Sequence, residues 1–388
     1  MSYDVIVLGV GAMGAAALER LASRGARVLG IEQWSVPNSL GSSGGDTRLI
    51  RKAYFEHPDY VPLLERAYEG WRRLEALSGL ELLYPTGTVY VGPPDGPLIG
   101  GSRMAAESHR LEFEPLAPAE LHDRFPGFRL PDGCVSAFEP QAGFVLAGHG
   151  INAFAKLAIA NGATLMSQTR VDGWRAESGG VVVSTSAGEL EAGALVIAAG
   201  SWSSDICRLP RVALNVTRQT LFWIWPERCA EFSLGRFPCW ALEIAGHPGI
   251  YYGFPACVPN TARVGAKFAH HAPGETCEPD GPKAPPSEAE YQATLRAVRS
   301  LLPGLRGSRI GSSICMYTNS RDGHFIVDRH PDHDAVTVAC GFSGHGFKFA
   351  PVMGELLADY ALEGTSRLPA EFLRIGTRDL WHADEPKP

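Results

Sequence analysis

The sequence predicts an α/β fold of two domains (α+β when both are counted together), in which a domain built on a parallel sheet is interrupted by an antiparallel, β-rich domain. Three observations predict this fold: a strand, glycine-rich turn and helix at the N-terminus, a second unit of the same kind near the C-terminus, and a strand-rich, aromatic segment over residues 212–268. We expect the first domain to comprise residues 1–80, 140–211 and 308–388, and the second to comprise residues 81–139 and 212–307.

The N-terminal unit carries the pattern of a dinucleotide site. Residues 3–8 (YDVIVL) predict a buried parallel strand, which a turn of spacing G-x-G-x-x-G and a helix follow. Gly9 permits the tight turn, Gly11 allows a pyrophosphate to approach the backbone, and Gly14 lets the helix pack on the strand. The free amides at the helix start favour the phosphates. We therefore expect a Rossmann-type, dinucleotide-binding domain.

The residues after this unit bear on which dinucleotide is bound. Glu32 ends the second strand (residues 26–31), where a carboxylate accepts ribose hydroxyls and repels a 2′-phosphate. An irregular, Gly/Ser-rich loop over residues 33–45 then replaces the next strand–helix repeat of a plain NAD domain. The motif alone does not choose between FAD and NAD. Later in the chain, an apolar strand leads into Ala199-Gly200-Ser201-Trp202. This pattern is found in many flavoproteins and shifts the choice toward FAD.

Composition excludes several classes of function. The net charge of −7 gives no general electrostatic reason to bind nucleic acid or an anionic membrane, and no apolar run is long enough to span a bilayer. The eight cysteines are scattered without a Cys-x-x-Cys pair, which predicts neither a disulfide scaffold nor a zinc site. The start of the chain lacks a basic segment typical of a secretory signal. We expect a cytoplasmic protein with reduced cysteines and no metal.

Two arginines follow the irregular loop, at Arg48 and Arg51. The residues alone leave two interpretations equally open: solvated charges at a helix entry, or cations beside the cofactor. His270-His271 and the pair His330 and His333 are more typical of loop and pocket residues than of metal ligands, because nothing at matching spacing completes a site.

Five segments carry a resemblance to a known family. The chain resembles, nearly end to end, the monomeric sarcosine oxidases and N-methyltryptophan oxidases, which are FAD-dependent amine oxidases of the glycine-oxidase-like group. The segments are residues 45–51 (GDTRLIR), 249–255 (GIYYGFP), 315–318 (CMYT), 324–328 (HFIVD) and 341–348 (GFSGHGFK).

The resemblance implies FAD bound covalently, as a thioether from Cys315 to the flavin 8α-methyl. A free cysteine is usually a small buried hydrophobe, and the family context reverses that interpretation. The motif and the resemblance together predict the following cofactor-binding residues: Gly9, Gly11, Ala12, Met13, Gly14, Glu32, Gln33, Ser42, Thr47, Arg48, Val171, Ala199, Gly200, Trp202, Cys315, Met316, Gly344, His345, Gly346 and Lys348.

The resemblance also implies the substrate site. Arg51 and Lys348 match the family residues that hold the substrate carboxylate, and Tyr252 matches a pocket tyrosine. The predicted catalytic residues are Lys267, Arg48, Tyr252 and His271.

The oxygen-activating cation has two alignments. With a two-residue insertion, Lys267 matches the family lysine and His271 keeps the family's i, i+4 spacing from it. Without the insertion, Arg263 occupies that position and Lys267 occupies the histidine's. We prefer Lys267, because a buried lysine has a defined role beside a flavin, where a cation stabilises developing negative charge on oxygen.

The implied reaction is oxidation of an N-methyl amino acid such as sarcosine by O₂, which gives formaldehyde, the demethylated amino acid and hydrogen peroxide. Ser42-Ser43-Gly44 stand where the family often has a histidine before Gly-Asp-Thr-Arg. This leaves room for a larger or cyclic secondary amino acid, either an N-alkyl amino acid or one of the L-pipecolate or proline type. The alternatives are a flavin dehydrogenase that passes electrons to a partner, and a non-catalytic flavoprotein. We expect a monomer that interacts only with its small-molecule substrate and O₂.

Overall fold

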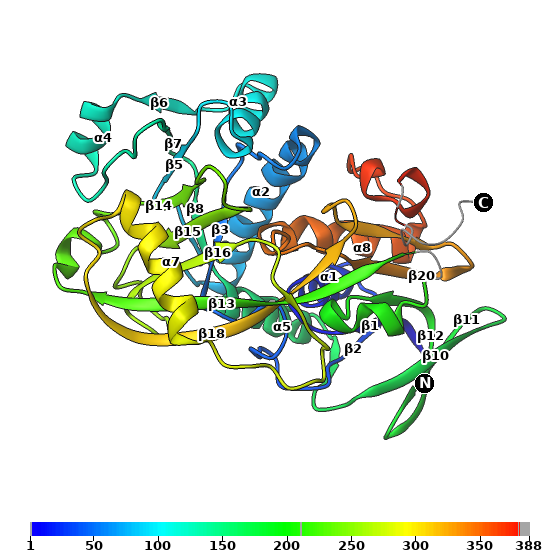
Figure 1. Cartoon of the computed structure of the whole chain (residues 1–388). Coiled ribbons are helices and arrows are strands. Elements are labelled where there is room, and N and C mark those ends of the chain that lie inside the picture. Colours follow the sequence, from blue (N-terminus) through cyan, green and yellow to red (C-terminus); the bar gives the residue numbers. More distant parts are fainter. Residues whose placement is uncertain (1, 210–211, 379, 381–388) are drawn as a thin grey trace.

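The computed structural model describes residues 2–209, 212–378 and 380, which form two lobes built on two large sheets and one small sheet (Figure 1). The predicted α/β fold, with a parallel sheet in one lobe and an antiparallel β-rich lobe inserted in its sequence, is confirmed. The domain boundaries stay a prediction. Strand β18 (Gly307–Ser320), which we expected in the first domain, pairs with β13 in the sheet of the second lobe.

The first lobe is built on an eight-stranded sheet whose centre is parallel. Strand β1 (Tyr3–Leu8) pairs in parallel with β2 (Val28–Ile31) and β12 (Gly188–Ile197), and β12 pairs in parallel with β20 (His333–Cys340). All four residues of β2 are buried, as expected for a strand covered on both faces. The remaining strands are β9 (Thr164–Met166), β10 (Val171–Glu177), β11 (Gly180–Thr185) and β19 (Ile326–His330).

Alternate residues of β1 contribute to the cores on the two faces of this sheet. Val5 and Val7 pack with the helices, whereas Ile6 and Leu8 pack on the other face with residues of β10, β11 and β20. Helix α1 packs against both α5 and α8. The helices of this layer are α1 (Ala12–Ser23), α2 (Val61–Ser78), α5 (Ala147–Ala160) and α8 (Ala350–Glu363).

The second lobe is built on a nine-stranded, mostly antiparallel sheet. Its core contains most of the aromatic residues of the β-rich segment, such as Phe222 and Phe268, which pack with Tyr291 of α7 (Glu288–Leu301). Helix α7 crosses over strands β13 and β18 in the view of Figure 1, and it contacts β15. The other strands are β5 (Thr88–Gly92), β6 (Glu114–Leu116), β7 (Val135–Glu139), β13 (Leu214–Pro226), β14 (Cys239–Leu242), β15 (Ile250–Phe254), β16 (Ala266–His271) and β17 (Glu275–Thr276).

A small three-stranded sheet carries the segment of the two arginines. Strand β3 (Thr47–Ile50) pairs with β8 (Gly143–Leu146), and β8 also pairs with β4 (Leu83–Tyr84). The remaining helices are α3 (Pro97–His109), α4 (Pro118–Arg124) and α6 (Ser203–Ile206). The 3₁₀ turns are η1 (Pro58–Tyr60), η2 (Gly200–Trp202), η3 (Cys229–Glu231), η4 (Phe347–Phe349), η5 (Glu371–Leu373) and η6 (Ile375–Thr377).

Long strands connect the lobes. β13 and β18 pair over most of their length, and the bridge Asn319↔Phe342 links the end of β18 to the glycine-rich segment after β20. This arrangement brings the middle of β18, where Cys315 lies, beside the carboxyl ends of the parallel strands. That edge of an open α/β sheet is where ligands bind.

Candidate active site

The glycine-rich turn after β1 has close contacts that only glycine allows. Gly9 has a φ of 85°, and a Cβ there would lie 2.6 Å from the carbonyl oxygen of Ala198. A Cβ at Gly14 would lie 1.8 Å from the carbonyl oxygen of Gly9, so α1 approaches the turn this closely only with glycine there. A Cβ at Gly11 would meet nothing nearer than Ser43 Oγ, at 3.9 Å, so the backbone of Gly11 is open to a ligand.

The start of α1 is open to an anion. Among the described residues, no side chain caps this helix at Gly11, and its first turn carries no acidic residue. The first amides of the helix therefore remain available to phosphate oxygens, in the field of the helix dipole. Beside them, the Glu32 carboxylate accepts from the amides of Val10 at 2.9 Å and Trp34 at 3.2 Å. These residues fit the pyrophosphate and ribose of a dinucleotide.

A cavity of about 320 Å³ extends from this turn to the second lobe. It brings together seventeen of the predicted site residues: Gly9, Gly11, Ala12, Met13, Glu32, Gln33, Ser42, Arg48, Val171, Ala199, Gly200, Trp202, Tyr252, Cys315, Met316, Gly344 and Gly346. The other predicted site residues do not line it: Gly14, Thr47, Arg51, Lys267, His271, His345 and Lys348.

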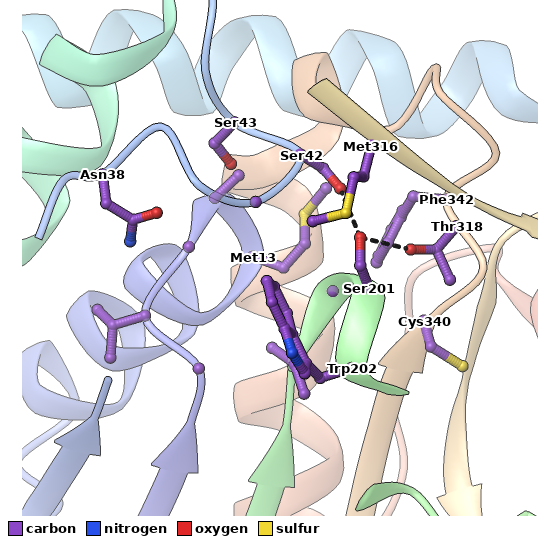
Figure 2. Close-up of a pocket in the computed structure, with 18 of the residues that line it drawn as sticks. Met13, Asn38, Ser42, Ser43, Ser201, Trp202, Met316, Thr318, Cys340 and Phe342 are labelled. Carbon is purple, nitrogen blue, oxygen red and sulfur yellow. Dashed lines mark hydrogen bonds between the residues drawn. The ribbon is translucent and has the colours of Figure 1, made fainter. Parts of the chain in front are cut away.

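Several lining residues were given no role from the sequence. Figure 2 shows Ser201 between Ser42 and Thr318, and its hydroxyl lies 3.4 Å from Ser42 Oγ and 3.3 Å from Thr318 Oγ1. Three segments distant in sequence are thus joined around the cavity. Trp34 and Trp202 also meet at its rim, with ring centroids 4.8 Å apart. Ser201 and Trp34 had no predicted role, and the only signal for them in the sequence was their position next to predicted residues.

Cys315 lies on β18 with its side chain 3% exposed and in the wall of the cavity. Burial raises the pKa of this thiol, and the charges of Arg48 and Lys267 act in the opposite direction. A cysteine beside two cations forms a thiolate more readily than burial alone would permit.

Arg48 contributes a cation to the cavity wall. Its guanidinium donates to the carbonyl oxygens of Thr47 and Ser42, at 2.9 Å each, and to that of Gly44. Arg48 lies on strand β3, and Arg51 is only 5% exposed. The interpretation of these two arginines as solvated charges at a helix entry is therefore wrong.

Lys267 lies on β16 and is buried. Its Nζ donates to the carbonyl oxygens of Gly45 at 2.6 Å and Thr47 at 2.8 Å, and burial together with Arg48 lowers its pKa well below the usual value. Arg263, the alternative candidate, lies over the Trp223 ring at 4.4 Å. Its side chain is 33% exposed and lies 3.9 Å from the Asp46 carboxylate. Of the two, the buried cation beside Arg48 is Lys267.

Arg51 forms a buried ion pair. Its Nη2 donates to both carboxylate oxygens of Glu56, at 2.6 and 2.7 Å. Against the effect of burial, the Arg51 guanidinium lowers the pKa of Glu56 to about 2, so this carboxylate stays ionised. A substrate carboxylate that binds Arg51 would compete with Glu56 for the same N–H groups.

Lys348 lies beside this ion pair, and Tyr54 contacts both cations. The Tyr54 ring lies 4.3 Å from the Arg51 guanidinium and 5.0 Å from Lys348 Nζ, which donates to the Tyr54 hydroxyl at 3.4 Å. Burial and the charge of Arg51 lower the pKa of Lys348 to about 7. Two cations predicted to hold one carboxylate thus lie on the same aromatic ring.

His345 is not among the residues that line the cavity, and its ring contacts Tyr54. Burial lowers the pKa of His345 to about 3, so its ring is neutral. Its Nε2 lies 2.9 Å from the carbonyl oxygen of Gly323 and must be the donor there, which leaves Nδ1 to accept from the Tyr54 hydroxyl at 2.5 Å. The His345 ring therefore holds Tyr54, and its carbonyl oxygen accepts from Lys348 Nζ at 2.6 Å. That His345 also binds the cofactor stays a prediction.

Glu139, a buried carboxylate of β7, fixes the backbone next to Arg51. It accepts from the amides of Lys52 at 2.6 Å and Ala53 at 3.2 Å, and from the Tyr90 hydroxyl at 2.7 Å. No local pattern indicates this role for Glu139, because its hydrogen-bond partners lie more than 40 positions away along the chain.

Tyr317 is the contact between the cavity wall and His271. It lines the cavity, and its hydroxyl lies 3.1 Å from Nδ1 of His271. Burial lowers the pKa of His271 to about 4, with further lowering from Lys348 and Arg51, which lie within electrostatic range of it. Tyr252, which also lines the cavity, has its pKa raised to about 12 by burial. The side chains of His271 and Tyr252 are therefore both neutral at physiological pH.

Metal-binding clusters and membrane-spanning helices are both absent from the part of the chain that the structure describes. No group of three or more His, Cys, Asp or Glu side chains there could hold a metal ion. Within the same residues, no helix has both the length and the apolar character to cross a bilayer.

Comparison with known proteins agrees with this geometry. Residues 4–360 match the family described as FAD dependent oxidoreductase. The chain is 39% identical to the monomeric sarcosine oxidase of Streptomyces avermitilis over 370 residues, which cover 95% of this chain and 96% of the relative. It is 33% identical to the N-methyl-L-tryptophan oxidase of Salmonella dublin, with 94% and 96% covered.

Solved structures show the same fold. The open form of NikD, an unusual amino acid oxidase of nikkomycin biosynthesis, has a TM-score of 0.85 at 24% identity and covers 96% of this chain and 97% of that one. Glycine oxidase from Geobacillus kaustophilus has a TM-score of 0.80 at 20% identity, with 97% and 99% covered. The protein thus belongs to the FAD-dependent oxidoreductases, in the group that includes monomeric sarcosine oxidases and N-methyl-L-tryptophan oxidases.

Proposed function

We propose that this enzyme oxidatively demethylates a small N-methyl amino acid such as sarcosine, using O₂ and producing formaldehyde, the demethylated amino acid and hydrogen peroxide. The observation that carries the proposal is the position of two buried cations, Arg51 and Lys348, on the single ring of Tyr54. Tyr317 lines the cavity and its hydroxyl lies 3.1 Å from His271, whose pKa is lowered by burial and by the charges of both cations. Such a pair suits one carboxylate in a site that excludes water. The relatives named sarcosine oxidase support the same substrate class.

The residues around the cavity would hold FAD, with the turn at Gly11 and the start of α1 at its pyrophosphate and Glu32 at a ribose. When bound, the flavin supplies a two-electron acceptor for oxidation of the amine and then returns the electrons to O₂. We further propose that Cys315 attaches it covalently, because this thiol lies in the cavity wall beside Arg48 and Lys267.

The side chains of the site position the substrate and select its protonation state. Arg51 and Lys348 would bind the carboxylate and thereby fix the N-methyl group relative to the cavity. Arg48, a cation in the cavity wall, disfavours a second positive charge and so favours the neutral amine, the form that can be oxidised. His271 is neutral, with its pKa near 4, and adds no opposing charge. This arrangement requires no general base.

A larger secondary amino acid is the second candidate. The small side chains of Ser42 and Ser43 line the cavity where the family often has a histidine, which leaves space beside the substrate. A relative acts, by its name, on N-methyl-L-tryptophan.

A panel of amines tests the proposal. Purified enzyme is incubated in air with sarcosine, N-methyl-L-tryptophan, L-proline, L-pipecolate and glycine, and peroxide and formaldehyde are measured. We expect both products in equal amounts from an N-methyl amino acid. Peroxide without formaldehyde, from the cyclic substrates alone, would favour the second candidate. Reduction of the flavin by substrate without re-oxidation in air would instead identify a dehydrogenase, and no reduction by any amine would contradict an enzymatic role. Gel filtration tests our further proposal that the enzyme is a monomer.

Replacing Glu56 with glutamine is expected to tighten binding of a carboxylate about tenfold. Glu56 occupies the N–H groups of Arg51 with both oxygens, and the neutral amide competes less strongly and leaves a buried positive charge uncompensated. Titration with methoxyacetate, which carries no amine, measures the Kd. The matched control is Glu69→Gln, which removes the carboxylate of the exposed Arg66–Glu69 pair on α2 and should leave the Kd unchanged. Weaker binding to Glu56→Gln would contradict the competition.

Binding of methoxyacetate is also expected to weaken as the pH rises through 7. The pKa of Lys348 is lowered to about 7, so its ammonium is present below this pH and is lost above it in the free enzyme. The affinity should be constant near pH 6 and fall by up to tenfold per pH unit above 7, until the raised pKa of the complex is reached. Glu56, His271 and His345, with pKa values near 2, 4 and 3, do not titrate in this range.

Lys267 is also buried and its pKa is also lowered, so it is the other group that could contribute to this pH dependence. The variant Lys348→Met separates the two lysines, because it should bind methoxyacetate weakly and without the step near pH 7. A step that persists in Lys348→Met would assign the titration to another group.

A further inference from the structure

Two cysteines of the second lobe lie in contact on its surface, away from the cavity. The sulfur atoms of Cys229 and Cys257 are 3.4 Å apart. Cys229 belongs to η3, in the connection between β13 and β14, and Cys257 follows β15 in the connection to β16. Cys257 is exposed and Cys229 is half-buried, so solvent reaches the pair from the side of Cys257.

The backbone holds the two segments together independently of the thiols. Residues Ser233 and Ala256 form a parallel bridge, in which the amide of Ala256 donates to Phe232 O at 2.7 Å and that of Leu234 donates to Ala256 O at 2.9 Å. Phe232 and Ala256 are fully buried and belong to the core of the lobe. The cysteines flank this bridge, so the approach of their sulfur atoms follows from a rigid part of the fold.

Local contacts hold the two thiols close to each other. The Ser233 hydroxyl donates to the carbonyl oxygen of Cys229 at 2.7 Å and lies 3.7 Å from each of the two sulfur atoms. Cys257 has a φ of 59°, in the left-handed region that a non-glycine residue adopts only when its surroundings hold it there. Its amide donates to Val264 O at 2.7 Å, which closes the loop on itself.

We propose that Cys229 and Cys257 form a redox-active dithiol, a modification site that peroxide converts to a disulfide. The exposed Cys257 thiolate first attacks one oxygen of hydrogen peroxide, which becomes the hydroxyl of a sulfenic acid, while the O–O bond breaks and the other oxygen leaves as water. The Cys229 sulfur then attacks the sulfenic sulfur, forming the S–S bond and releasing a second water. Overall, two thiols and one hydrogen peroxide give one disulfide and two waters. The pair needs to close by little more than 1 Å to reach the S–S bond length of about 2.05 Å.

Other cysteines provide the comparison. Cys340 and Cys207 also neighbour each other, but both are buried, and Cys340 lines the cavity. Cys277 is half-buried, as Cys229 is, and lies in a different connection, after β17. Cys229 and Cys257 therefore combine contact between their sulfur atoms with access to solvent. The proposal does not depend on the substrate of the enzyme, because the oxidant can be added.

Mass spectrometry of the holoenzyme tests the site. The protein is treated with hydrogen peroxide, its remaining thiols are alkylated, and its peptides are mapped without and with a reductant. We expect one cross-linked peptide pair joining Cys229 to Cys257, a mass loss of two hydrogens, and recovery of both alkylated cysteines after reduction. Recovery of both as free thiols, separate oxidation to sulfinic acids, or linkage to other cysteines would overturn the proposal.

Matched variants make the outcome specific. In Cys229→Ser, no linkage should form and Cys257 should instead gain oxygen atoms, because its resolving partner is missing. Cys277→Ser should form the linkage as the unaltered enzyme does. Linkage should also form faster at pH 9 than at pH 7, since the thiolate is the reactive form and burial raises the pKa of the Cys229 thiol. Equal over-oxidation of Cys257 in the unaltered enzyme and in Cys229→Ser would contradict the role of Cys229.

Discussion

Replacement of Lys267 by methionine is expected to slow re-oxidation of the reduced flavin by O₂ about 10²- to 10³-fold, while the rate of reduction by substrate changes by less than about tenfold. Lys267 is 3% exposed, and its Nζ is held by the carbonyl oxygens of Gly45 and Thr47 and lies 4.6 Å from the centre of the Phe254 ring. Burial and the charge of Arg48 lower its pKa, and no carboxylate among the described residues forms an ion pair with it. Negative charge that develops on oxygen nearby would supply the missing compensation.

Stopped-flow measurement of the two half-reactions checks this prediction. The enzyme is reduced anaerobically by substrate in one experiment, and the reduced enzyme is mixed with O₂ in the other. The matched control is Arg263→Met, which removes the alternative cation on the same hairpin and should leave both rates within about threefold. Equal slowing of both half-reactions in Lys267→Met, or slow re-oxidation in Arg263→Met, would assign the oxygen-side cation differently. Re-oxidation should also slow as the pH rises through the lowered pKa of Lys267.

The parts of the fold and site that follow from local sequence could be predicted. The strand at residues 3–8, the glycine turn and Glu32 form one continuous segment, so their spacing alone places them at the end of the parallel sheet. Seventeen of the predicted site residues line one cavity. Most of them lie in glycine-rich turns or next to them, where a short motif fixes the backbone.

The parts that depend on long-range pairing could not be predicted. Glu56 was not considered, because nothing in the local pattern indicates that its carboxylate turns inward to Arg51. Glu139 is a buried carboxylate only because β7 passes beside the segment after β3, and that contact spans 87 positions. Lys348 and Arg51 were inferred from resemblance, and their meeting at Tyr54 results from packing of η4 against the small sheet. Such contacts form between elements rather than within one.

Replacement of Cys315 by serine is expected to abolish covalent attachment of the flavin completely. The thiol of Cys315 lies in the cavity wall, and Arg48 and Lys267 favour the thiolate that attack on a flavin methyl group requires. The serine hydroxyl occupies nearly the same volume but remains protonated at neutral pH, so it cannot take over the reaction. The fold should be retained, because the substitution preserves the size of one buried side chain on β18.

Denaturation with acid followed by absorption spectroscopy of the pellet and the supernatant measures attachment. The unaltered enzyme should keep a yellow protein pellet, whereas Cys315→Ser should release its flavin to the supernatant. The matched control is Cys340→Ser, because Cys340 is buried and lines the same cavity. If attachment depends on the position of Cys315 beside the two cations, rather than on any cysteine near the flavin, Cys340→Ser keeps its yellow pellet. Release of all flavin from the unaltered enzyme would refute the linkage, and release from Cys340→Ser alone would move it to β20.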